Sequence, residues 1–200
     1  HINRRLFFSY VGILMTDEKV YDKTMEMKEA IDKNVNDGDT LMIQWQAFAP
    51  MAAIHEVIRQ EKKNLTLTSS ALAHGGDVLI GSGCVDKVIA GYVGVELVGL
   101  SQNFRRAVEE NIPHEIEFEE YANFNIQMMN LAAHFGWPFV PAGKNLLGTD
   151  YLEKGTEKRR FEVAECPFTG EKTVLLPSFS PDVGMVQAQR ADKKGNVQAW

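Results

Sequence analysis

The sequence has few cysteines, no basic cluster and no long apolar stretch, and each absence removes a class of protein. Only Cys84 and Cys166 occur in 200 residues, without a CxxC pair or a histidine pair nearby, so neither a disulfide framework nor a metal site is indicated. Two buried thiols in a reducing cytoplasm are the expected arrangement. The formal net charge is -6 without a basic block, which argues against nucleic-acid binding.

The longest apolar stretch near the start, residues 6–15, is too short to cross a bilayer and contains Ser9 and Gly12. No small-residue cleavage site follows it, so we expect no signal peptide, no membrane contact and a cytoplasmic location. The composition, 44% apolar and 24% charged residues, is typical of a globular chain with one ordinary domain.

Short apolar runs alternate with amphipathic segments over most of the chain. The runs lie at 40–43, 65–68, 85–92 and 114–118, and helical periodicity appears at 17–35, 50–60, 103–110 and 121–135. This alternation predicts an α/β fold, a doubly wound and mostly parallel sheet with helices on both faces. After Arg160 the pattern changes to short strands at 161–164, 172–176 and 183–186, so we expect a β-rich C-terminal part.

Ligands of doubly wound sheets bind beyond the carboxyl ends of the strands, so the residues that follow the strands are candidates for a site. They are 44–48 after the first strand, Ser69, Ser70 and His74-Gly75-Gly76 after the second, and Glu96 after the third. Hydroxyls and glycine N–H groups suit a carboxylate, and a histidine suits acid or base work near neutral pH. Each residue also has a plain explanation as part of a turn or loop.

Two other groups of residues carry possible chemistry. Carboxylates alternate with apolar residues over 115–120; most should lie on a solvated strand face, while Glu119 and Glu120, nearest the strand end, are candidate general bases. Arg105 and Arg106 stand at a helix start, which suits either an anionic partner or a salt bridge to a following glutamate. The segment 81–83 lacks the third glycine of a dinucleotide fingerprint.

Five blocks of the sequence resemble the A subunit of the class I CoA-transferases, most closely the glutaconate CoA-transferase type. They are residues 75–83, 91–96, 103–109, 167–171 and 190–196. The resemblance implies one α/β domain of the CoA-transferase type over residues 15–200, with 1–14 as an upstream or non-native extension. Family A subunits continue beyond the last block, which leaves truncation at Trp200 an open question.

The resemblance implies an active site divided between two subunits. In the family a glutamate on the B subunit makes a nucleophilic attack on an acyl-CoA, and CoA then forms a glutamyl-CoA thioester that a second carboxylate intercepts. This chain is expected to be the A subunit of a heteromeric acyl-CoA:carboxylate CoA-transferase, with coenzyme A as substrate and no bound cofactor. Its expected contributions are an apolar interface with the B subunit and substrate contacts from Ser69, Ser70, Gly75, Gly76, Glu96 and Gln46.

One departure from the family pattern keeps other functions open. Family A subunits commonly place a Gly-Gly-Phe turn after the first strand, where this chain has Gln44-Trp45-Gln46. Bulky side chains there prevent close approach of the backbone, and they either line a larger acyl pocket or only fill the loop. The alternative is a subunit of a CoA-dependent hydrolase that opens a cyclic acyl-CoA, with Glu119, Glu120 or His74 as acid or base. A sugar-phosphate sensor ranks third, because a regulator would need a DNA-binding helix-turn-helix and we see none before residue 17.

Overall fold

The computed structural model describes residues 22–44, 49–95, 99–144, 146–157 and 160–199. The chain divides into two compact units, unit 1 with residues 1–120 and 181–200 and unit 2 with residues 121–180. Residues 1–14, which the sequence analysis set apart as an extension, lie outside the described residues.

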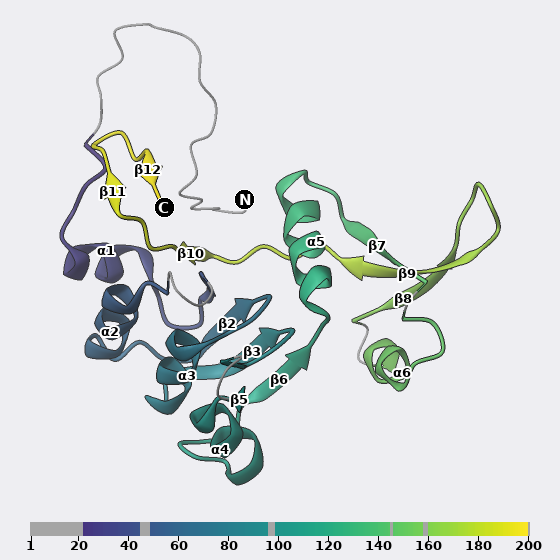
Figure 1. The fold of residues 1–200 in the computed structure, drawn as a ribbon, viewed down its shortest axis with the longest axis horizontal. Helices are drawn as coiled ribbons and strands as arrows, with labels where there is room; N and C mark the ends of the chain where they lie inside the picture. The colour runs from purple at the N-terminus through teal and green to yellow at the C-terminus, as the bar shows by residue number, and fades with distance from the viewer. Residues whose placement is uncertain (1–21, 45–48, 96–98, 145, 158–159, 200) are drawn as a thin grey trace, which may run out of the picture. The chain divides into compact units, whose positions relative to one another are not determined.

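Unit 1 is built on a five-stranded parallel sheet (Figure 1). Its strands, in the order β10-β1-β2-β3-β6, are β10 (Val183–Met185), β1 (Thr40–Ile43), β2 (Leu65–Ser69), β3 (Val85–Ala90) and β6 (Glu117–Glu120). The predicted α/β class, parallel sheet and β-rich C-terminal part are confirmed. The fourth predicted strand, 114–118, begins later than expected, at Glu117; His114 lies before it, with its ring Nε2 3.0 Å from the Val85 carbonyl oxygen at the start of β3.

The four described helices of unit 1 pack on one face of this sheet. They are α1 (Met27–Asn34), α2 (Met51–Arg59), α3 (His74–Gly81) and α4 (Gln102–Glu110), and they share one apolar core with the strands. Leu41, Leu67 and Val88 form a row on the helix-covered face, and all three are fully buried.

In the described part of unit 1, helices therefore cover one face of the sheet, whereas the sequence predicted helices on both faces. The reason is the strand order: β1, β2, β3 and β6 follow one another across the sheet, and successive right-handed crossovers in one direction place their helices on the same side. The other face carries the polar row Thr40, Thr66, Lys87 and Glu117.

Helix α3 was not predicted, since Gly75, Gly76 and Gly81 gave this segment the composition of a loop. Unit 1 also contains two small hairpins, β4 (Gly94–Val95) with β5 (Gly99–Leu100) and β11 (Arg190–Ala191) with β12 (Val197–Gln198). The turn of the second hairpin is closed by Asp192, whose carboxylate accepts the N–H groups of Lys194 and Asn196 at 2.9 Å.

Unit 2 joins one long helix to an antiparallel sheet. Its elements are α5 (Asn123–His134), β7 (Phe139–Gly143), α6 (Asp150–Glu157), β8 (Glu162–Glu165) and β9 (Lys172–Pro177), with strand order β7-β9-β8. Phe161 lies at its centre, edge-on to Tyr121 with ring centroids 5.5 Å apart. None of the helices in the described parts of the chain is both long enough and apolar enough to span a membrane.

Candidate functional site

A small pocket lies at the carboxyl ends of β1 and β2, the edge where the sequence analysis expected a ligand. Ile43 ends β1, and residues 71–73 connect β2 to α3. The described residues that line it are Ile43, Gln44, Ala49, Ala71, Leu72, Ala73, Gly75 and Gly76. The described part of the wall therefore consists of apolar side chains, backbone and one amide.

Gln44 fixes the loop after β1 to the segment after β10. Its main-chain N–H donates to the Met185 carbonyl at 3.0 Å, and its side-chain oxygen accepts the N–H of Gln187 at 2.8 Å. Gln44 is thus held in place at one side of the pocket. Trp45 and Gln46, the other members of the departure from the family pattern, lie outside the described residues, so the predicted substrate contact of Gln46 stays a prediction.

The first turn of α3 supplies backbone donors to the pocket. The residue before the helix, Ala73, has no side chain that caps it, and the first N–H that bonds within the helix is that of Asp77, to the Ala73 carbonyl at 3.1 Å. The N–H groups of residues 74–76 precede that bond, and a helix start of this kind carries partial positive charge. Chemically, this end of the pocket suits a carboxylate or another anion.

Close packing explains the two glycines without a ligand. A Cβ atom on Gly75 would lie 2.5 Å from Cδ1 of Ile54 in α2, and one on Gly76 would lie 2.9 Å from Cβ of Leu72. The glycines therefore let α3 approach α2 and the preceding loop closely. The same closeness places their backbone in the pocket wall.

The two predicted serines stand at the right edge of the sheet but not in the pocket lining. Ser69 is the buried last residue of β2, in register with Ala90 of β3, which is in turn in register with Glu120. Ser70 is half-buried, and its carbonyl accepts the N–H of Gly91 at 3.1 Å. Their contact with a substrate remains a prediction.

The predicted acid–base residues are spread over different places. His74 is exposed at the first position of α3 and does not line the pocket, Glu120 is exposed at the end of β6, and Glu96 lies outside the described residues. Glu119 lies on the sheet face opposite the helices, where its carboxylate is 2.8 Å from Nζ of Lys87.

Burial of Lys87 disfavours its charge, but the hydrogen bond to Glu119 and the charges of Glu119 and Glu117 outweigh it, and the pKa of Lys87 is raised. The structure thus gives Glu119 an ion-pair role, and its role as a base stays a prediction.

Asp77 is a residue that the sequence analysis missed, and it joins two of the five blocks. Its carboxylate accepts the N–H of Phe104 at 2.9 Å and the side-chain amide of Asn103 at 3.2 Å. The residue before α4, Ser101, provides no capping side chain, so a carboxylate from α3 caps α4 instead. A Cβ on Gly81 would lie 2.6 Å from Cγ of Asn103, so this contact also needs glycine.

The arginine at the start of α4 forms a salt bridge within its own helix. Both guanidinium contacts of Arg105 to Glu109 measure 3.1 Å, and this hydrogen bonding and charge raise the pKa of Arg105. Of the two explanations for the arginines at this helix start, the structure supports the salt bridge for Arg105.

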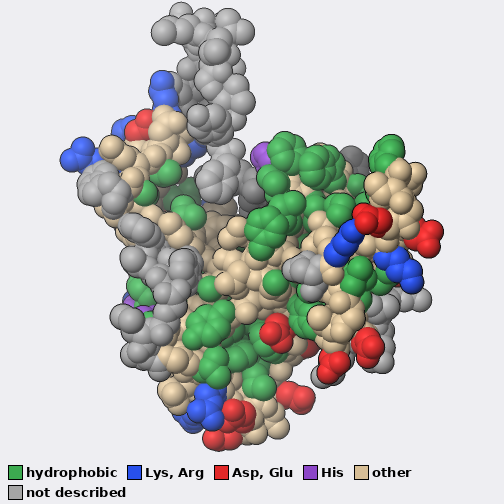
Figure 2. All heavy atoms as spheres, turned by 45° about the vertical axis from the view of Figure 1, so that its right-hand side comes forward, with side chains coloured by type: hydrophobic (Ala, Val, Ile, Leu, Met, Phe, Trp, Pro, Cys, Tyr) green, Lys and Arg blue, Asp and Glu red, His purple; other side chains and the backbone are tan. Residues whose placement is uncertain are grey.

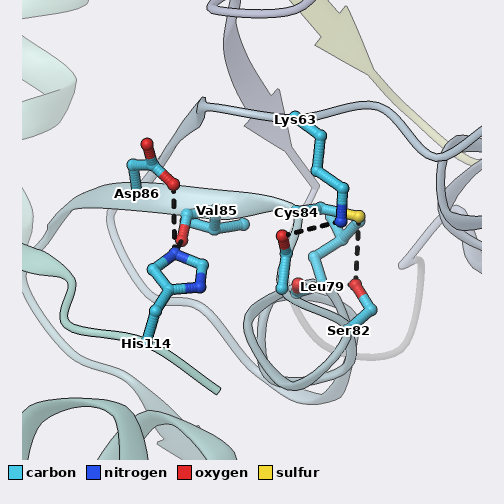
Figure 3. A network of polar contacts seen from close by, with 8 residues as sticks. Lys63, Leu79, Ser82, Cys84, Val85, Asp86 and His114 are labelled. Atoms are coloured by element: carbon cyan, nitrogen blue, oxygen red, sulfur yellow. Dashed lines mark hydrogen bonds and ion pairs between the residues drawn. The ribbon is translucent and has the colours of Figure 1, made fainter. Parts of the chain in front are cut away.

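A polar network lies at the opposite end of β3 from the pocket edge (Figure 3). His114 Nε2 is 3.0 Å from the Val85 carbonyl oxygen and 3.0 Å from a carboxylate oxygen of Asp86. Beside it, the Ser82 hydroxyl donates to the Leu79 carbonyl at 2.8 Å and lies 3.1 Å from the sulfur of buried Cys84. These contacts fix the α3–β3 connection.

The prediction of two buried thiols is right for Cys84 and wrong for Cys166. Cys166 is partly exposed because it stands where the β8–β9 hairpin turns. Hydrogen bonds from the Thr169 hydroxyl and from the N–H groups of Phe168 and Thr169 lower the pKa of its thiol. In the parts of the chain that the structure describes, no cluster of histidine, cysteine and carboxylate side chains could hold a metal ion.

Comparison with known proteins identifies relatives across most of the chain. A family model described as "Coenzyme A transferase" matches residues 24–200. The chain is 37% identical over 177 residues to the A subunit of 3-oxoadipate CoA-transferase from Pseudomonas knackmussii, covering 88% of this chain and 61% of that protein. It is 32% identical over 193 residues to the A subunit of glutaconate CoA-transferase from Acidaminococcus fermentans, covering 89% and 59%.

Solved structures give the same picture. The crystal structure of glutaconate coenzyme A-transferase from Acidaminococcus fermentans matches with a TM-score of 0.79 and 31% identity, over 88% of this chain and 59% of that one. The decarboxylase AibA/AibB matches with a TM-score of 0.72 and 26% identity, over 86% and 64%. The chain spans about three-fifths of the length of the two curated relatives.

Proposed function

This chain belongs to the coenzyme A transferase family, and on that premise we propose that it is the A subunit of a heteromeric acyl-CoA:carboxylate CoA-transferase. The observation that carries the proposal is the identity of 37% and 32% to two proteins that are each named as the A subunit of such an enzyme. The catalytic glutamate then belongs to a B subunit, coenzyme A is a substrate, and the location is cytoplasmic.

The chemistry of the pocket supports this division of labour. Among the residues that the structure describes around it, none of the eight that line the pocket has a carboxylate, thiol or hydroxyl side chain. Such a wall can shape and orient an acyl group, but it cannot attack a thioester. A nucleophile supplied by a second chain is what this pocket lacks for covalent catalysis.

We assign the recognition of a substrate carboxylate to the first turn of α3. The backbone of Gly75 and Gly76 in the pocket wall offers N–H groups that suit an anion, and Ala71, Leu72 and Ala73 add apolar side chains to the same wall. The substrates named for the two relatives, 3-oxoadipate and glutaconate, are both dicarboxylates, so the substrate class proposed here is a dicarboxylic acyl group. The proposed contacts are Ser69, Ser70, Gly75, Gly76, Glu96 and Gln46.

The test is peptide mass spectrometry on the complex with the candidate B subunit, after incubation with dicarboxylic and monocarboxylic acyl-CoAs and mild reduction. The expected result is a modified glutamate on the B subunit, none on this chain, and faster modification by the dicarboxylic acyl-CoA. A modified glutamate on this chain would contradict the proposal. Equal rates with both substrate classes would contradict the carboxylate site alone.

The hydrolase remains the second candidate because a structural relative at 26% identity is named a decarboxylase, which shows that relatives with this fold are not confined to transferases. Free CoA released without any glutamate adduct would favour it. Glu119, Glu120 and His74 would then be the residues to replace first.

A further inference from the structure

Helix α5 is apolar on two opposite faces, and only one of them is covered. Ile126, Met129 and other buried residues pack toward the sheet of unit 2. On the opposite side Phe124, Leu131 and Phe135 are 67%, 42% and 56% exposed. Spacings of seven and four residues place these three in a single stripe along the helix.

The stripe continues into the loop and strand that follow. The ring of Phe135 stacks on Trp137 with centroids 5.1 Å apart, and Trp137 and Phe139 are 49% and 48% exposed. We call these five side chains, Phe124, Leu131, Phe135, Trp137 and Phe139, the α5–β7 patch. Figure 2 shows hydrophobic side chains gathered over α5.

The segment that carries the patch contains no charged residue. From position 121 to 143 there is no aspartate, glutamate, lysine or arginine, although 24% of the whole chain is charged. The nearest charges along the chain are Glu120 and Lys144. Depletion of charge together with exposed aromatic rings distinguishes the centre of a protein–protein interface from ordinary surface.

We propose that the α5–β7 patch is the surface on which the B subunit docks, an inference that rests on the proposed function. A helix that is apolar on two opposite faces leaves one of them exposed unless a second surface covers it. Each of the five large side chains has a surface of roughly 200 Å², and about half of it is exposed, so the patch offers about 500 Å² of apolar surface. This is more than half of the ~800 Å² that each partner buries in a stable complex.

The chemistry of the patch selects an uncharged, apolar protein surface as its partner. A helix that binds a membrane surface carries lysine or arginine along its polar side, and a site for nucleic acid needs cations, whereas residues 121–143 have neither. Stacked aromatic rings with few rotatable bonds are the side chains that most often dominate binding between proteins. A permanent partner subunit matches these requirements.

The experiment compares the complex of the full chain and the candidate B subunit with that formed by Phe124→Asp/Phe135→Asp. We expect the affinity for the B subunit to fall at least ~100-fold, since two central aromatic anchors are lost and charges are buried. The matched control is Val108→Asp on α4, at a side chain that is 46% exposed in unit 1, which should leave the affinity unchanged. Trp137→Ala adds no charge and should weaken binding about 10-fold, which keeps the test decisive if the double variant does not fold by circular dichroism.

Four results would overturn the inference: unchanged affinity in the patch variants, an equal loss in Val108→Asp, no complex with the B subunit, or a homodimer that the patch variants dissociate. Transferase activity of the wild-type complex is measured separately. An inactive complex that depends on the patch contradicts the proposed function and leaves the docking surface standing. An active complex whose affinity does not depend on the patch contradicts the docking surface and leaves the proposed function standing.

Discussion

Replacement of Gly75 by alanine separates a packing role from a ligand role for this glycine. The added methyl group would meet Cδ1 of Ile54 at 2.5 Å, and Ile54 is fully buried, so it has little room to move. Overpacking of this kind costs about 1–3 kcal/mol. Alanine gains about 0.5–1 kcal/mol over glycine in a helix, so we expect a net loss of up to about 2.5 kcal/mol, with a middle value of about 1 kcal/mol.

The decisive measurement is a double-mutant cycle with Ile54→Val, which deletes the clashing methyl group. Alone, Ile54→Val should cost about 0.5–1.5 kcal/mol. Because the shortened side chain makes room for the new methyl, the loss of stability in Gly75→Ala/Ile54→Val should be smaller than the sum of the two single losses. We expect a difference of at least ~1 kcal/mol in urea unfolding. Gly184→Ala, where nothing lies within 4 Å of the added atom, is the control and should be close to neutral.

If glycine is required at position 75 only because a ligand approaches its backbone, the outcome is different. Gly75→Ala would then be as stable as the wild type or more stable, and it would lose activity in the complex without any coupling to Ile54. That result would refute the packing argument.

Three further outcomes test other contacts. Asp77→Ala should lower the stability by about 0.5–2 kcal/mol through loss of the cap on α4, and Asp77→Asn, which keeps an oxygen acceptor without the charge, should lose less; an Asp77→Asn variant as stable as the wild type in thermal unfolding would contradict a charge-assisted cap. The raised pKa of Lys87 means that its ion pairs stabilise the fold below the pKa of an unfolded lysine and that this contribution is lost as the pH rises through the folded pKa. The wild type should therefore lose more stability than Lys87→Met on passing above about pH 10, and parallel urea-denaturation curves would refute this. Cys166, partly exposed and with a lowered pKa, should react with iodoacetamide faster than buried Cys84, and Thr169→Val should slow it; equal rates at the two cysteines in peptide mass spectrometry would contradict the hydrogen-bonded turn.

The sequence predicted the strands well because short runs of apolar and β-branched residues bounded by turn residues leave a strong signal. The runs at 40–43 and 65–68 became β1 and β2 almost unchanged. It missed α3 because hydrophobic periodicity and helix propensity do not show that Gly75 and Gly81 are required by neighbouring helices. Strand order is also invisible in the pattern, and that order decides which face the helices cover.

The sequence predicted where the site lies but only some of the residues that line it. The rule that ligands bind beyond strand ends located the edge of the sheet, but a wall of alanines carries no chemical signature in a sequence. Ser69, Ser70 and His74 were chosen for their functional groups, and none of the three lines the pocket. Asp77 was overlooked because its partners are 26 and 27 residues away along the chain.

The strand β10 makes completion of the first unit depend on the order of synthesis. It pairs with β1, and Asp182 exchanges two hydrogen bonds with Thr40, 142 residues earlier in the chain. During translation β1 stays an open edge until residues 183–185 leave the ribosome, by which time all of unit 2 has emerged. A chain that ends within unit 2 therefore lacks β10 and leaves β1 as an unpaired edge strand, which is prone to pair with other chains.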